Sequence, residues 1–142
     1  KIEAVDEDIE VGADVEDVEL SAPMVAIQSG SGLIKRCSAE DCSRVLQNGQ
    51  CAEHGEVEGE FDLRIKAVFD DGQRVQYAIF DKEATEAITG VTLDEATEMA
   101  MDALDTGVVE ESFIDSLVGQ YYSVIGSVVG QYLLVEEAER LE

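Results

Sequence analysis

The sequence has no tryptophan, one proline and one histidine, and only nine of its 142 residues are basic. No stretch of eighteen apolar residues occurs, which excludes a membrane-spanning helix. No N-terminal stretch has the pattern of a signal peptide, so we expect a protein of the cytoplasm. The length allows one well-buried core with a small insert, and because the sequence begins at Lys1 we expect a piece of a longer protein.

The scarcity of positive charge gives information about the binding partner of the protein and about the salt concentration around it. With 33 acidic residues the formal net charge is −24, and a uniformly acidic surface repels the phosphates of a nucleic acid. The acids occur in every segment, and only four lysines are present. This pattern suits a cytoplasm of very high salt, where the Debye length falls to about 3 Å and self-repulsion is screened. We therefore interpret the acidity first as a mark of a high-salt cytoplasm.

The few basic residues are concentrated in the middle of the chain. Seven of the nine lie between residues 35 and 82: Lys35, Arg36, Arg44, Arg64, Lys66, Arg74 and Lys82. Chance spacing accounts for this distribution, and so does a surface selected to bind an anion. The sequence leaves both explanations open.

All three cysteines and the only histidine fall within residues 37–54. Four residues separate Cys37 from Cys42 and two separate Cys51 from His54, and the stretch between the pairs carries the hairpin-turn signal Asn48-Gly49. Zinc takes four nitrogen or sulfur ligands in a tetrahedron, which two such pairs can supply. We predict that these four residues bind Zn²⁺ in a zinc-ribbon insert spanning residues 35–56.

Two other readings of this cluster are weaker. Three cysteines cannot all pair as disulfides, and nothing in the sequence signals secretion. A Cys–His nucleophile pair lacks the third group that would orient the base. Four protein ligands leave no open position for a reactive water, so we expect a structural metal and no enzymatic activity.

The pattern along the chain predicts a mainly β fold with helices. Alternation over Phe61–Phe69 indicates a half-buried strand, Asp81 is a helix N-cap, and Thr92 with Glu95 forms a capping box. We expect an acidic lead-in at 1–23, strands at 24–28, 61–69, 74–80, 121–126 and 130–135, helices at 82–89, 92–105 and 110–117, and a polar tail at 137–142. Five strands with a helical segment between the third and fourth follow the plan of the oligonucleotide/oligosaccharide-binding (OB) barrel, predicted here at 24–136.

Segments 28–37, 46–51 and 54–64, with the Cys42 knuckle between them, resemble the zinc-bearing OB domain of the replication protein A large subunit in its haloarchaeal form. The resemblance covers about residues 24–136. His54 stands where eukaryotic members typically have a fourth cysteine, and zinc accepts either ligand. The resemblance implies binding of single-stranded DNA in replication, repair and recombination, with other replication protein A subunits as further partners.

Proteins of this fold lay the strand across the second and third barrel strands, stacking bases on aromatic rings. We predict that Phe61, Phe69 and Tyr77 point to the core. We place the following residues in contact with DNA: Arg64, Lys66 and Arg74 at phosphates, Gln76 at base edges or sugar, Phe80 in stacking, Tyr121 or Tyr122 at the groove, since neighbours on a strand point to opposite faces, and also Arg44. In high salt we expect affinity to depend on stacking more than on charge.

Two other functions remain open. The domain is alternatively a protein-interaction module for subunit assembly, with the helix at 93–104 and the third helix at 110–117 as an apolar docking face and little DNA binding. A weaker alternative is a zinc-ribbon component of transcription or RNA processing.

Overall fold

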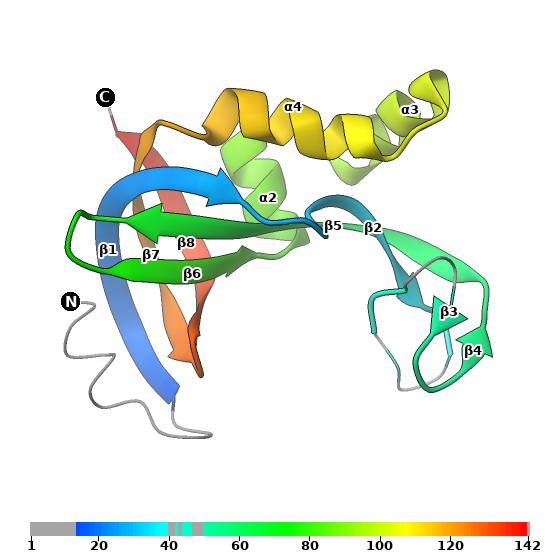
Figure 1. The fold of residues 1–142 in the computed structure, drawn as a ribbon, viewed down its shortest axis with the longest axis horizontal. Coiled ribbons are helices and arrows are strands. Elements are labelled where there is room, and N and C mark those ends of the chain that lie inside the picture. The colour runs from blue at the N-terminus through cyan, green and yellow to red at the C-terminus, as the bar shows by residue number, and fades with distance from the viewer. Residues whose placement is uncertain (1–13, 40–41, 43, 47–49, 142) are drawn as a thin grey trace.

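The structure is a computed structural model, and it describes residues 14–39, 42, 44–46 and 50–141. Within this part the fold is mainly β with three helices (Figure 1). The elements are β1 (Asp14–Ile27), β2 (Gly32–Cys37), β3 (Gln50–Cys51), β4 (Gly55–Glu56), β5 (Gly59–Asp70), β6 (Val75–Phe80), α2 (Lys82–Thr89), α3 (Leu93–Ala103), α4 (Gly107–Leu117), β7 (Tyr121–Val129) and β8 (Tyr132–Leu141). None of these helices is long and apolar enough to cross a membrane.

Five strands form a ring. The sheet order is β1-β7-β8-β6-β5-β2, and an additional pairing of β1 with β5 closes the first five strands of this series into a ring, with β2 paired to β5 outside it. Strands β6 and β8 run parallel, whereas the other neighbours in this sheet are antiparallel. The three helices lie between β6 and β7, which are the third and fourth strands of the ring. This connectivity is consistent with the expected OB-like fold.

Strand β1 contributes to two sides of the ring. Residues up to Pro23 pair with β7, and the register shifts between Met24 and Ala26 as the strand turns to pair with β5. Such a bulge bends a strand, which lets one strand serve two partners. The strand expected at 24–28 is therefore the end of a longer one, and Pro23 lies inside it. The division into a lead-in, a domain of 24–136 and a tail stays a prediction.

The core fills the ring and the space beneath the helices. Leu63, Ile65, Ala67 and Phe69 on β5 are fully buried, as the alternation predicts. Phe113 of α4 and Tyr122 of β7 belong to the same core, and the Tyr122 hydroxyl donates to the Leu117 carbonyl at 2.8 Å. Figure 1 shows the helices along one side of the ring.

The helix boundaries follow from local chemistry. The Asp81 side chain accepts a hydrogen bond from the Ala84 N–H, and α2 ends at Gly90 in the left-handed conformation. The capping box between Thr92 and Glu95 is formed at the start of α3. Side chains at helix starts satisfy N–H groups that have no partner within the helix, so these sequence signals determine where the helices begin.

The insert lies between β2 and β5 and contains the short β3–β4 hairpin. It projects from one end of the ring in Figure 1. The predicted turn at Asn48-Gly49 lies outside the described residues.

Candidate metal centre and nucleic-acid interface

Cys37, Cys42, Cys51 and His54 lie together in the insert, with their ligand atoms all within 4.8 Å of one another. Cys51 Sγ is 3.8 Å from Cys42 Sγ and 3.5 Å from His54 Nδ1. Cys37 Sγ is 3.6 Å from the same nitrogen. A tetrahedron with metal–sulfur bonds of about 2.3 Å has edges of about 3.8 Å, so these separations fit one metal ion held by three sulfurs and one nitrogen.

Different elements deliver the four ligands. Cys37 ends β2, Cys51 ends β3, and His54 follows in the turn before β4. The backbone holds the first knuckle, because the Ala39 N–H donates to Cys37 Sγ at 3.4 Å and the Cys42 N–H donates to the Ala39 carbonyl at 3.0 Å. The cysteines are free, so the cluster is not a disulfide.

The surroundings of Cys37 and Cys51 shift the pKa values of their thiols in opposite directions. Burial raises the pKa of Cys37. Burial also acts to raise the pKa of Cys51, but hydrogen bonds from the Glu53 backbone and from His54 outweigh it and lower that pKa to about 6. Thiolates are the form that binds metals, so the surroundings of Cys51, but not those of Cys37, favour the charge state that a metal needs.

The outer face of the ring carries two rows of side chains that cross three strands. We define the outer face as these rows together with Arg64. One row is Val68, Tyr77 and Tyr132, and the other is Lys66, Ile79 and Leu134. The rings of Tyr77 and Tyr132 are 6.2 Å apart.

Arg64 is tied to the loop between β1 and β2. Its Nε donates to the Gly30 carbonyl at 2.8 Å, and the neighbouring Lys66 N–H donates to the Ser31 hydroxyl at the same distance. Burial, and then the nearby Arg36, lower the pKa of the Arg64 guanidinium. The cation is therefore held in one place at the edge of the outer face.

The prediction that Phe80 and Gln76 face outward from β6 was wrong. Phe80 and Gln76 are buried, with 0% and 5% of their surfaces exposed, whereas Tyr77 is half-buried on the outer face. Gln76 Nε2 donates to the carbonyls of Tyr77 and Gln131, so it is held by the backbone and does not face a ligand. The cause is register: Asp70 lies opposite Val75, so even positions on β5 face odd positions on β6.

The remaining predicted residues belong to three parts of the chain: strand β7, the turn before β6, and the insert. Tyr122 is buried and Tyr121 is exposed, which confirms that one of this pair faces outward. Arg74 lies half-buried just before β6. Arg44 lies in the insert, where its Nε is 3.6 Å from a carboxylate oxygen of Glu53.

Sequence reasoning missed Tyr77 and Tyr132 as outward rings, and it missed Phe61, which is 38% exposed. The length of the β5–β6 turn carried the signal for Tyr77. The turn has four residues, Asp71 to Arg74, so each even-numbered residue of β5 pairs with an odd-numbered residue of β6. This register places Tyr77 beside Val68.

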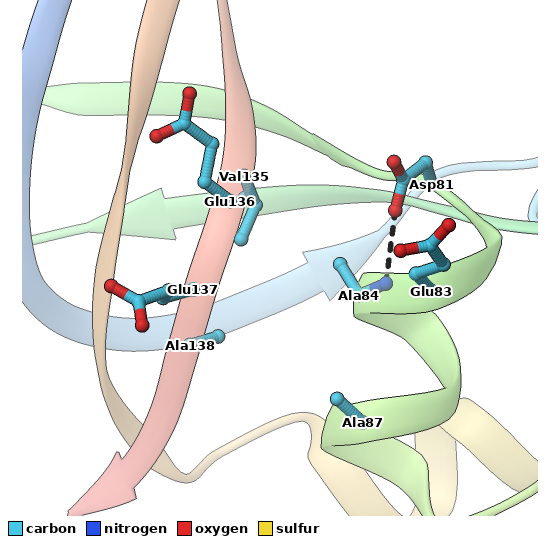
Figure 2. Close-up of a pocket in the computed structure, with 8 residues that line it drawn as sticks. All are labelled: Asp81, Glu83, Ala84, Ala87, Val135, Glu136, Glu137 and Ala138. Atoms are coloured by element: carbon cyan, nitrogen blue, oxygen red, sulfur yellow. Dashed lines mark hydrogen bonds between the residues drawn. The ribbon is translucent and has the colours of Figure 1, made fainter.

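A groove lies between α2 and β8, and its lining differs in charge from the outer face, which carries Arg64 and Lys66 (Figure 2). Its volume is about 510 Å³. Four acids line it, namely Asp81, Glu83, Glu136 and Glu137. Such a lining disfavours a phosphate, so this groove is not a candidate site for a nucleic acid.

The sequence matches no protein-family model and no curated protein. Eleven chains of solved structures resemble it. One belongs to a replication protein A heterotrimer solved bound to ssDNA, with a TM-score of 0.59 and 12% identity. The match covers 99% of this chain and 35% of that one. The likeness shows that this chain has an OB-like fold similar to that of a replication protein A chain.

Proposed function

We propose that this chain binds single-stranded DNA on the outer face defined above. The observation that carries the proposal is the pair of outward rings, Tyr77 and Tyr132, beside the two cations Arg64 and Lys66. Single-strand binders combine stacking platforms with cations that track the backbone, and this face offers both. The likeness to a replication protein A chain supports the same reading.

The proposal extends to the biological setting that the sequence suggests. The chain acts as a replication protein A-like protein in replication, repair and recombination, in the form found in haloarchaea, with other subunits as partners. The net charge of −24 supports a cytoplasm of very high salt. Binding to a partner subunit in place of DNA is the alternative that the experiment below separates.

The strengths of base stacking and of phosphate contacts indicate which of the two determines affinity. Each base stacked on a ring contributes about 1–3 kcal/mol. Phosphate contacts act by releasing counterions and weaken as salt rises. In molar salt, stacking on Tyr77 and Tyr132 supplies most of the affinity, while Arg64 and Lys66 set the register of the strand.

The insert is proposed to hold one Zn²⁺ through Cys37, Cys42, Cys51 and His54. The three-sulfur, one-nitrogen donor set and its near-tetrahedral edges support zinc. The ion would cross-link the insert and have no catalytic role, because four protein ligands complete its coordination. It keeps the insert folded beside the outer face.

Fluorescence anisotropy with labelled oligothymidine, duplex DNA and single-stranded RNA tests the function. We expect binding to oligothymidine that is tighter than to duplex DNA, with Kd changing by less than about ten-fold between 0.5 and 2 M KCl. Affinity that collapses over this range contradicts stacking as the main contribution. No binding to oligothymidine at any salt concentration, with the chain folded, rejects the proposed function and favours the interaction module.

A further inference from the structure

A second hollow lies where the insert meets the ring. Its volume is about 300 Å³, and it lies between β2, β5, the insert and the segment joining α3 to α4. Apolar side chains form much of its wall, including Ile34, Val45, Leu46 and Phe61. Pockets for small ligands begin at about this volume and combine apolar walls with a few polar groups.

The charge of this hollow is opposite to that of the chain. Lys35 and Arg64 line it, and none of the described residues around it is an acid, although the chain has a net charge of −24. The groove in Figure 2, by comparison, is lined by four acids. In so acidic a protein, two cations at one apolar hollow favour an anionic ligand there.

Phe61 gives the hollow an aromatic wall. It lies opposite Lys35 in the β2–β5 register, and the Lys35 ammonium is 4.9 Å from the centre of its ring. Phe61 is 38% exposed, whereas the other phenylalanines, Phe69, Phe80 and Phe113, are at most 1% exposed. Packing in the core therefore does not explain the position of this ring.

Arg64 connects the hollow to the outer face. It lines the hollow, and it also stands on β5 two residues before Lys66. Its bond to the Gly30 carbonyl holds the guanidinium at the boundary between the two surfaces. Thr106, at the start of α4, also lines the hollow, and its side chain makes no capping hydrogen bond to that helix. Arg64 therefore borders both the hollow and the outer face.

We propose that this hollow binds one nucleotide of the single strand, with the base against Phe61 and the phosphate at Lys35 and Arg64. The inference rests on the proposed function and adds to it a subsite at the base of the insert. It also gives the metal-bound insert a role in binding, because Val45 and Leu46 of the insert form part of the wall.

Fluorine NMR of the whole chain labelled with 4-fluorophenylalanine tests this site directly. The chain has four phenylalanines, and loss of one resonance in Phe61→Leu assigns the exposed one. The three buried rings report whether each variant is folded. We expect oligothymidine to shift the Phe61 resonance, and Phe61→Leu and Lys35→Gln each to raise Kd about five-fold or more. Met101→Ala, an exposed position on α3, is the control and should leave Kd unchanged.

The outcomes separate this inference from the proposed function. If Tyr77→Leu weakens binding while the Phe61 resonance and the Kd of Phe61→Leu do not change, the hollow is unused and the inference is wrong, although binding on the outer face stands. If the wild-type chain does not bind oligothymidine, both are wrong. Thymidine monophosphate added alone shows whether a free nucleotide or only a strand fills the hollow, and either result supports the site. An equal shift with inorganic phosphate identifies a general anion site and overturns the inference.

Discussion

Tyr77 of β6 and Tyr132 of β8 lie directly opposite each other on parallel strands, with ring centroids 6.2 Å apart and planes inclined at 45°. Both are half-buried and belong to the outer face. Replacing both with leucine keeps apolar volume but removes the stacking surfaces. We expect the double variant to lose about 2 kcal/mol or more of binding free energy for oligothymidine, measured by anisotropy. Unchanged affinity, with circular dichroism showing a native fold, would contradict the assignment of this face.

The metal site gives a prediction about the insert. Cys42→Ser removes one ligand, so we expect the purified variant to lose its zinc, whereas the wild type holds one ion per chain by mass spectrometry. Hydrogen exchange should become fast in the insert and change little in the ring. Ala39→Ser is the matched control, because it lies in the same knuckle and keeps the backbone N–H that donates to Cys37 Sγ. Zinc retained by Cys42→Ser at full occupancy would reject the four-ligand site.

Gly126 marks a close approach of β7 to β8. A Cβ at this position would lie 2.0 Å from the Leu134 carbonyl oxygen, and the register of the two strands shifts here. We expect Gly126→Ala to lower the free energy of unfolding by about 3 kcal/mol or more, because backbone must move to relieve the contact. Urea denaturation measures the change. Ser127→Ala, the next position on the strand, should change it by less than about 1 kcal/mol.

Leu104 ends α3 in the left-handed conformation, at φ 56°, with 92% of its surface exposed. A leucine there has an unfavourable backbone conformation and contributes no packing in return. We expect Leu104→Gly to raise the free energy of unfolding by about 0.5–1 kcal/mol. Met101→Gly, one turn earlier inside the helix, should lower it by about 1 kcal/mol. A loss of stability in Leu104→Gly would show that this side chain makes a contact in solution.

Asp71 makes the β5–β6 turn sensitive to pH. Backbone N–H groups of Arg74 and Gln73 donate to its carboxylate and hold its pKa below the ordinary value of 3.8. The unfolded chain thus binds this proton more readily than the folded one, and stability rises with pH. The contribution is fully present above about pH 4 to 5 and is lost as pH falls through the lowered pKa.

Urea denaturation at several pH values tests the role of Asp71. The difference in unfolding free energy between the parent and Asp71→Asn should be larger at pH 6 than at pH 2.5. Gln73→Ala keeps both the carboxylate and the N–H donors, so its pH dependence should match the parent. A difference for Asp71→Asn that stays constant with pH would show that the carboxylate has no special stabilisation.

Local chemistry in the sequence determined several features of this protein. The cap at Asp81, the box of Thr92 with Glu95, and the buried alternation along β5 depend on residues close to one another in the chain, and the structure has all of them. The grouping of Cys37, Cys42, Cys51 and His54 is also local. Short knuckles bring such ligands together whatever the rest of the fold does.

Tertiary structure decided which face of β6 became the core. Both faces carry apolar residues, with Tyr77 and Ile79 on one and Ala78 and Phe80 on the other, so a period of two cannot distinguish inside from outside. Only pairing with β5 and β8 settles it, and that register turns Phe80 inward and Tyr77 outward. The hollow beside Phe61 likewise exists only because β2, β5, the insert and α4 meet in space, which no local pattern specifies.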